Sequence, residues 1–227
     1  MSSPNIKMLQ TVASGMRELL EKVAFVGGTV VELYPTNPAA SEVRATLDVD
    51  CVIEIYSRTA YAELENTLRS KGFSNDISEG APICRWIYKN ITVDVMPDDP
   101  DIIGFSNKWY SDGIQNKIKK ELPNGQDIFI FRPEYFLCTK FEAHRSRGGN
   151  DLRQSRDFED IVYLIENYPE ITEDITRADK NVKAYLKQKC RILLENPNLS
   201  EGIDCALSSG SLESDQIIEI IKTIVKK

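Results

Sequence analysis

The sequence lacks the long apolar run that a membrane helix needs. No hydrophobic segment approaches the roughly 20 residues that cross a bilayer. Residues 1–7, Met-Ser-Ser-Pro-Asn-Ile-Lys, also lack the apolar centre of a secretory signal peptide. From these two absences we expect a cytoplasmic protein with no membrane partner.

Cysteine and positive charge are both in short supply. The five cysteines are widely spaced and odd in number, so the chain offers neither a disulfide framework nor a zinc-ligand spacing. Cys51, Cys84 and Cys138 lie among apolar residues and are expected to be small buried side chains. The net charge of −7 argues against a protein that coats nucleic acid, because such proteins carry a broad basic surface. A small, locally basic groove remains compatible with it.

The hydrophobic pattern changes near residue 132. Before it, strands are expected at 24–26, 47–55, 83–89, 91–96 and 127–131, with a turn at Lys89-Asn90 and helices at 6–24, 29–34 and 61–71. After it, helices are expected at 134–147, 155–167, 176–195 and 213–226, whereas residues 106–126 give no clear pattern. We therefore predict an α/β (α+β) domain at 1–132 and a helical domain at 133–227.

A glycine pair leaves the first short strand. Gly27 and Gly28, followed by Thr29, would offer bare backbone N–H groups to phosphate. Such a pair alone is as readily explained by a tight turn. The order of the glycines and the aspartates that follow them favours a nucleotide site.

Three aspartates form the second half of this pattern. Asp48 and Asp50 alternate on one strand and so share a face, and Asp94 lies on a later strand within Val-Asp-Val. Converging carboxylates repel one another by roughly 1–4 kcal/mol per pair, and Mg²⁺ prefers an all-oxygen site of this kind. We assign Asp48 and Asp50 as metal ligands, and Asp94 as a ligand and general base. The competing interpretation of Asp-x-Asp is a solvated strand face.

Several segments resemble the AbiEii-like nucleotidyltransferases, which are the toxins of type IV toxin–antitoxin systems. These segments are Phe-Val-Gly-Gly-Thr at 25–29, Arg-Ala-Thr-Leu-Asp-Val-Asp at 44–50, Arg-Pro-Glu-Tyr-Phe-Leu-Cys-Thr-Lys-Phe-Glu-Ala at 132–143 and Arg-Asp-Phe-Glu-Asp-Ile at 156–161. The likeness covers roughly residues 23–165. Its glycine and Asp-x-Asp part is shared by the whole polymerase-β-like superfamily, and the last two segments are more particular.

The resemblance implies a mixed sheet flanked by helices, with a C-terminal helical part closing a nucleotide cleft. It implies a transferase that binds ATP or another NTP with one or two Mg²⁺ ions. The transferred nucleoside monophosphate would go to an RNA such as tRNA or to a protein, and a cognate antitoxin would be a partner. Gly27, Gly28 and Thr29 would contact phosphates, Lys140 would reach the triphosphate, and Asp157 would be the acidic residue of the last motif.

This chain departs from the family pattern in two places. The gap between Gly28 and Asp48 is longer than is usual in the superfamily, and Gly28 stands where many members carry serine. Two rival functions therefore stay open. One is a catalytically inactive module that binds a nucleotide or partner. The other is an adenylyltransferase of the aminoglycoside type, whose cationic acceptor would suit an acidic protein.

Other polar residues have simpler explanations beside their functional ones. Lys140 could pair with Asp157 or Asp160, which lie three apart on one expected helix. His144, the only histidine, is favoured as a hydrogen-bonding residue over a general base. Trp86 is expected in the core rather than stacked on a base.

Overall fold

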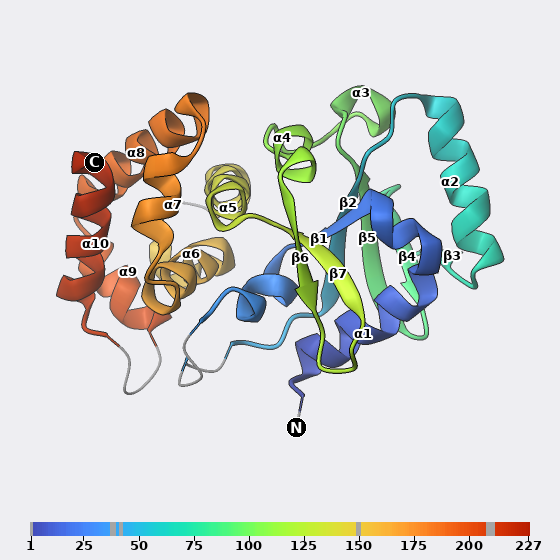
Figure 1. Ribbon diagram of the computed structural model, residues 1–227, viewed down its shortest axis with the longest axis horizontal. Coiled ribbons are helices and arrows are strands. Elements are labelled where there is room, and N and C mark those ends of the chain that lie inside the picture. Colours follow the sequence, from blue (N-terminus) through green and yellow to red (C-terminus); the bar gives the residue numbers. More distant parts are fainter. Residues whose placement is uncertain (1, 37–39, 41–42, 149–150, 208–211) are drawn as a thin grey trace. The chain divides into compact units, whose positions relative to one another are not determined.

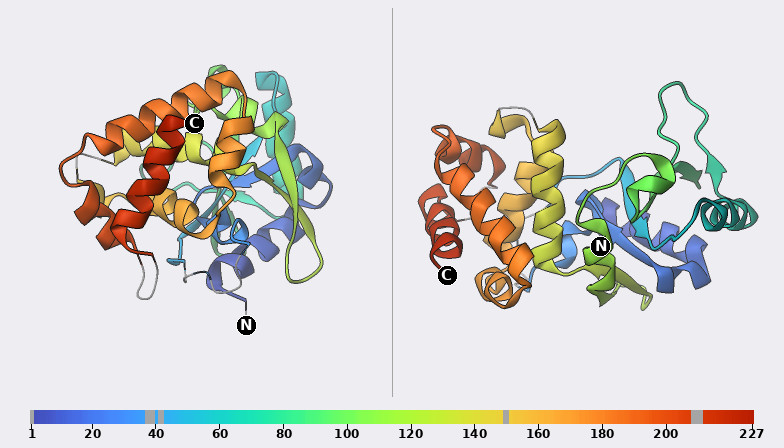
Figure 2. Two further views of the ribbon diagram at one scale, coloured as in Figure 1. Left: turned by 60° about the vertical axis from the view of Figure 1, so that its left-hand side comes forward. Right: turned by 90° about the horizontal axis from the view of Figure 1, so that it is seen from above.

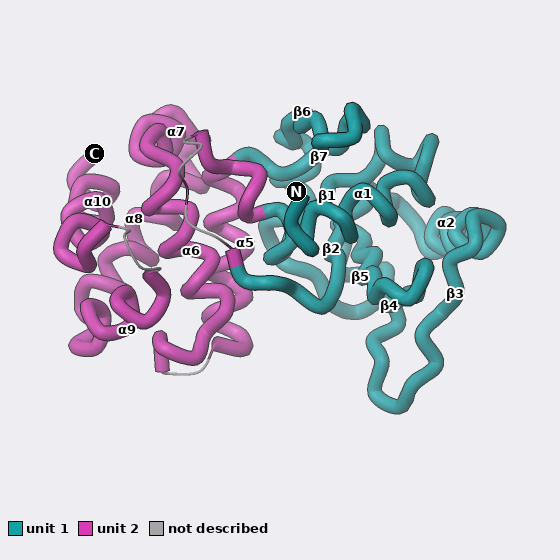
Figure 3. Tube along the Cα trace, turned by 90° about the horizontal axis from the view of Figure 1, so that it is seen from below, with its two compact units in different colours: residues 1–30, 44–132 teal, residues 31–43, 133–227 magenta. Residues whose placement is uncertain are grey.

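The computed structural model describes residues 2–36, 40, 43–148, 151–207 and 212–227 (Figure 1). The chain forms two compact units, one of residues 1–30 and 44–132 and the other of residues 31–43 and 133–227 (Figure 3). Residues 31–43 thus group with the helical C-terminal part, although they precede the aspartate strands in sequence. No helix in the described ranges is long and apolar enough to span a membrane.

Within the described residues, the first unit holds one seven-stranded sheet with the strand order β3-β4-β5-β2-β1-β7-β6. The strands are β1 (Val23–Val26), β2 (Asp48–Ile53), β3 (Ser74–Asn75), β4 (Arg85–Tyr88), β5 (Ile91–Pro97), β6 (Lys117–Glu121) and β7 (Asp127–Phe131). β2 pairs in parallel with β5 and antiparallel with β1. The two strands that carry the aspartates are therefore neighbours at the centre of a mixed sheet.

Helices of the first unit pack on both faces of this sheet. They are α1 (Pro4–Met16), α2 (Arg58–Ser70), α3 (Pro100–Ile103) and α4 (Tyr110–Gln115), with the 3₁₀ helices η1 (Arg17–Lys22) and η2 (Gly28–Leu33), the last of which continues into the second unit. Gly15 of α1 lies against the ring of Tyr88, and Arg69 of α2 lies over the ring of Trp86. Trp86 and Tyr88 alternate with Arg85 on β4, so α1 and α2 cover the face opposite Arg85 and the aspartates.

The second unit is helical in its described residues. It contains α5 (Pro133–Arg147), η3 (Leu152–Gln154), α6 (Arg156–Asn167), α7 (Ile171–Arg177), α8 (Lys180–Leu194), α9 (Leu199–Ala206) and α10 (Ser214–Lys226). The first ten residues of α5 are buried, because this helix packs against α6, α7 and α8. α8 and α10 lie side by side (Figure 2).

Most expected elements are confirmed, and the errors have physical causes. The helix expected at 6–24 ends at Met16, because Arg17 adopts a positive φ of 51° and the chain continues as a 3₁₀ helix. The unassigned residues 106–126 contain α4 and β6. β6 has a polar sequence because it is an edge strand, where lysines oppose edge-to-edge pairing.

The helix expected at 176–195 is two helices. The chain extends at Ala178 and Asp179, and Tyr135 of α5 donates a hydrogen bond to the Asp179 carboxylate at 3.0 Å. A tertiary contact therefore lies at the break between the two helices. The sequence has no glycine or proline there that would predict the break. The loop expected at Gly148-Gly149-Asn150 lies partly outside the described residues.

The expected burial of cysteines is confirmed. Cys51, Cys84 and Cys138 are buried free thiols, as is Cys190, while Cys205 is exposed. Burial raises the pKa of the Cys51 thiol well above its ordinary value and that of Cys84 to about 12. These thiols therefore act as small apolar side chains rather than as nucleophiles.

We expect Gly113→Ala to destabilise the first unit by about 1–2 kcal/mol. A Cβ at this position of α4 would lie 2.4 Å from the buried ring of Phe131, and the overlap outweighs the gain in helix propensity. Urea unfolding would measure the change, with Ser111→Ala on the exposed side of the same helix as control. Equal stability of the two variants would contradict the packing.

Candidate functional site

The three aspartates predicted to converge lie together in the structure. The parallel register of β2 and β5 sets Asp50 directly opposite Asp94, and Asp48 lies two residues before Asp50 on the same face. One carboxylate oxygen of each residue lies within 4.8 Å of the others. Asp48 and Asp50 are half-buried, and Asp94 is 8% exposed. In the described part of the chain, no second group of three or more His, Cys, Asp or Glu side chains lies this close together.

Arg85, which belongs to none of the motifs recognised in the sequence, completes this cluster. Its Nε and Nη2 each donate a 2.8 Å hydrogen bond to a different oxygen of Asp94, in a two-pronged ion pair. This hydrogen-bonded pairing, against the cost of partial burial, raises the pKa of Arg85 above its ordinary value. Arg85 therefore stays charged and neutralises one of the three carboxylates.

A signal for Arg85 was present in the sequence. The expected turn at Lys89-Asn90 has two residues with positive φ, 47° and 64°, as in the tightest hairpins. A two-residue turn pairs Tyr88 with Ile91, and counting back along both strands pairs Arg85 with Asp94. The hairpin alone thus places a guanidinium beside the third carboxylate.

Gly27 leaves space for the Asp50 carboxylate, a role that is independent of phosphate binding. Its φ is +74°, which L-residues with side chains rarely adopt. A Cβ built on Gly27 would lie 2.0 Å from Oδ2 of Asp50, so the carboxylate occupies the space that a side chain would fill. The glycine motif and the Asp-x-Asp motif are therefore in direct contact.

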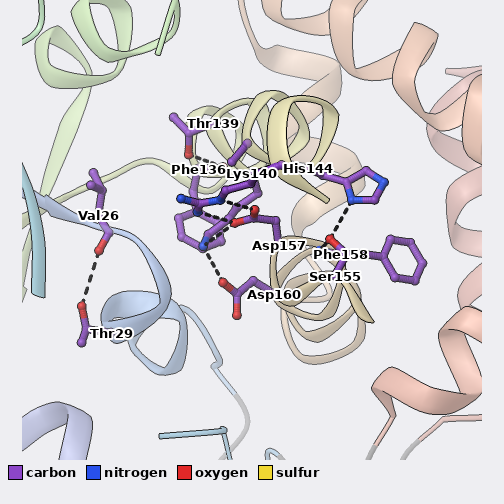
Figure 4. A network of polar contacts seen from close by, with 12 residues as sticks. Val26, Thr29, Phe136, Thr139, Lys140, His144, Ser155, Asp157, Phe158 and Asp160 are labelled. Carbon is purple, nitrogen blue, oxygen red and sulfur yellow. Dashed lines mark hydrogen bonds and ion pairs between the residues drawn. The ribbon is translucent and has the colours of Figure 1, made fainter. Parts of the chain in front are cut away.

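The other two residues of the predicted phosphate turn lie in the first 3₁₀ turn after β1. Gly28 begins η2, and the side chain of Thr29 is fully buried. The Thr29 hydroxyl donates to the Val26 carbonyl at 3.5 Å (Figure 4). In this conformation the hydroxyl is directed at its own chain, and contact of Gly27, Gly28 and Thr29 with phosphate stays a prediction.

Lys140 lies in a buried ion-pair network of the second unit (Figure 4). Its Nζ is 2.5 Å from Asp160 Oδ2 and 3.4 Å from Asp157 Oδ1, and the three residues are 5%, 2% and 4% exposed. Arg147 donates to both oxygens of Asp157, at 2.9 and 3.0 Å. Burial raises the pKa of Asp157, but the Arg147 hydrogen bonds and the Lys140 charge outweigh it and leave the pKa below its usual value.

This network ties α5 to α6. The pairing of Lys140 with the two aspartates, one of the alternatives open at the sequence level, is what the structure shows. Contact of Lys140 and Asp157 with a nucleotide remains a prediction, and it would require Lys140 to exchange a carboxylate partner for a phosphate.

The remaining candidates are held within the fold. His144 Nδ1 lies 2.7 Å from the hydroxyl of Ser155, whose side chain caps α6 by accepting from the Phe158 N–H. Burial lowers the pKa of His144, which favours the neutral ring. Trp86 is fully buried, as expected for a core residue, and Trp109 is 6% exposed.

The donor set at the three aspartates fits a hard divalent cation. All ligand atoms are carboxylate oxygens, which Mg²⁺ prefers over sulfur or imidazole donors. With Arg85 included, the four side chains carry a net charge of −2. One divalent cation would neutralise this charge.

Comparison with known proteins gives a likeness of fold. No protein-family model matches the chain, and no curated protein sequence matches it. A solved structure of an antigenic nucleotidyltransferase-like protein from Paracoccidioides brasiliensis aligns with a TM-score of 0.53 and 21% sequence identity. The alignment covers 90% of this chain and 94% of that one. The two proteins share a fold. The expected nucleotidyltransferase-like mixed sheet flanked by helices is thereby confirmed.

We expect Gly27→Ala to cost more stability than Gly125→Ala. Gly125 has a similar φ of +77° with no atom within 4 Å of a built Cβ, so both variants lose about 1–2 kcal/mol to backbone strain. Gly27→Ala alone also displaces the Asp50 carboxylate, which adds about 1–3 kcal/mol. In an Asp50→Ala background most of this extra loss should disappear, because only the Cβ of residue 50, 2.9 Å from the built Cβ, remains in the way; urea unfolding measures the difference. Equal losses in the original background would contradict the contact.

Lys140→Met should destabilise the protein by about 3–5 kcal/mol, because it leaves Asp157 and Asp160 buried with less compensating charge. The matched control is Lys222→Met, which removes an exposed pair with Glu219 on α10 and should cost less than about 1 kcal/mol. Chemical denaturation measures both. A Lys140 variant as stable as the control, but weaker in nucleotide binding, would instead favour the triphosphate contact.

Proposed function

We propose that this protein is a Mg²⁺-dependent nucleotidyltransferase that moves a nucleoside monophosphate from an NTP to an acceptor. The observation that carries the proposal is the convergence of Asp48, Asp50 and Asp94 on two adjacent strands at the centre of a nucleotidyltransferase-like sheet. Carboxylates held this close favour a cation between them, because the cation relieves their mutual repulsion. The likeness of fold supports the same reaction class.

In this proposal each carboxylate has a defined part. Asp48, Asp50 and Asp94 would hold Mg²⁺, which when bound offsets charge on the triphosphate oxygens. The acceptor oxygen forms a bond to the α-phosphorus, the bond to pyrophosphate breaks, and the acceptor proton leaves to a base. Both oxygens of Asp94 already accept hydrogen bonds from Arg85, which favours the ligand role over the base role for this residue.

The nucleotide would use the predicted phosphate turn. Backbone N–H groups of Gly27 and Gly28 would bind phosphate oxygens, since the buried Thr29 hydroxyl is directed at Val26. Lys140 and Asp157 remain candidates for nucleotide contact through the exchange of partners described above. The AbiEii resemblance extends the proposal to an RNA acceptor such as tRNA, or a protein acceptor, with a cognate antitoxin as partner.

A nucleotide-binding module without catalysis is the second candidate. Arg85 favours it, because a fixed guanidinium already neutralises one of the three carboxylates that would otherwise call for a cation. A small-molecule adenylyltransferase shares the chemistry of the first proposal and differs only in the acceptor.

Incubation with each α-labelled NTP, Mg²⁺ and a cell extract tests the proposal. Wild-type protein should transfer label, and Asp50→Ala should reduce transfer at least about a hundredfold by removing a ligand from the charge-stabilising site. Lys119→Gln, which removes a surface partner of Asp127, is the control and should transfer normally. The labelled species, whether RNA, protein or small molecule, identifies the acceptor class.

Two outcomes count against transfer. NTP binding that is unchanged by EDTA, with no labelled product from any extract, would support the binding module. Transfer that survives in Asp50→Ala would show that the aspartate cluster does not perform the reaction.

A further inference from the structure

The hydrogen bonds of Arg85 distinguish it from a surface arginine. The two hydrogen bonds described for its guanidinium both go to oxygens of Asp94. The negative charge of Asp48 also favours the charged form of the guanidinium. The side chain of Arg85 is 30% exposed, and the side chain of Asp94, taken without its backbone, is 11% exposed. A cross-strand pair in a regular hairpin fixes where this guanidinium can reach.

The fork geometry limits what Asp94 can offer to a metal. Each carboxylate oxygen has two lone pairs, and one on each oxygen is taken by Arg85. Asp94 can therefore donate to a cation only with the one remaining lone pair on each oxygen, half of what a carboxylate without this fork would offer. Arg85 also adds a positive charge where a second cation would otherwise balance the cluster.

We propose that Arg85 is a positioning residue that acts as the built-in cation of this cluster, so that the nucleotide-free protein binds one divalent cation at the three aspartates and not two. This inference rests on the proposed metal site and adds its stoichiometry. The guanidinium holds Asp94 beside Asp48 and Asp50 while no metal is bound, and it repels an incoming cation. The site is thus stabilised when empty and moderate in its affinity for metal.

Removal of Arg85 should therefore have opposite effects on stability and on metal affinity. A guanidinium at roughly 6 Å repels a divalent cation by an amount worth about tenfold in affinity even at the dielectric constant of water. Arg85→Gln should bind Mn²⁺ about tenfold more tightly than wild type, or gain a second Mn²⁺. The metal-free variant should melt at a lower temperature, because Asp94 then faces Asp48 and Asp50 without the guanidinium that pairs with it. Added Mn²⁺ should raise its melting temperature by more than that of wild type.

The experiment uses full-length protein freed of metal with EDTA and then dialysed. Titration with Mn²⁺, followed by the electron paramagnetic resonance signal of the free ion, gives the stoichiometry and dissociation constant. Melting with and without Mn²⁺ gives the second readout. Arg85→Lys, which keeps the charge, should stay within about threefold of the wild-type affinity, and it provides a second variant if Arg85→Gln does not fold.

A matched control removes one positive charge elsewhere in the same sheet. Lys119 lies on β6, three strands away from β2 in the sheet order, and pairs with Asp127 of β7. Lys119→Gln should leave both the Mn²⁺ affinity and the response of the melting temperature to Mn²⁺ unchanged. A tighter site in this variant would mean that overall charge, and not Arg85, sets the affinity.

The outcomes separate this inference from the proposed function. One Mn²⁺ on the wild type, lost in Asp50→Asn and tightened in Arg85→Gln, supports both. Mn²⁺ binding that is weaker or unchanged in Arg85→Gln overturns only the role of Arg85 and leaves the metal site standing. The same holds if Arg85→Gln keeps the wild-type affinity while Arg85→Lys loses it, or if the wild type binds two equivalent ions. No Mn²⁺ binding by wild type overturns the metal site itself, and the inference with it.

Discussion

The parallel pairing of β2 with β5 is the constraint on which the candidate site depends. It sets Asp50 opposite Asp94 at the centre of a sheet, where the strands are held from both sides and cannot separate to relieve repulsion. Carboxylates that cannot move apart must be neutralised. Arg85 on β4, the strand next to β5, supplies part of the neutralising positive charge. Because Gly27 has no side chain, the Asp50 carboxylate has room beside the turn.

The second unit solves a related problem in a different way. Asp157 and Asp160 are more deeply buried than the aspartates on β2, and two cations, Lys140 and Arg147, lie against them. Burial without pairing would cost several kcal/mol per charge, so this network is closed by ion pairs within the unit. The cluster on β2 and β5 remains partly exposed, and its described ion pair is the one between Arg85 and Asp94. Three converging carboxylates at an accessible site are what separates a candidate binding site from a structural ion pair.

Local pattern predicted most of the sheet and the convergence of its aspartates, because strand periodicity and a two-residue turn act over a few residues. It failed where distant contacts decide. Nothing near Ala178 indicates the break that the contact between Tyr135 and Asp179 accompanies, and the polar sequence of β6 identifies a strand only once its place at the sheet edge is known. The burial of Lys140 likewise depends on the packing of α5 against α6, which helical spacing alone does not determine.

Gly27 shows how one residue can satisfy two requirements that sequence patterns treat as separate. A glycine before a helical turn is commonly explained by the approach of phosphate to the backbone. Here the space above Gly27 already holds an aspartate carboxylate, and the backbone is in a conformation that disfavours any side chain. The requirement for glycine therefore exists before any nucleotide binds. It would persist in a protein of this fold that had lost catalysis but kept Asp50, so the glycine motif by itself indicates the architecture of the cluster, and the reaction must be argued from the carboxylates and their charge.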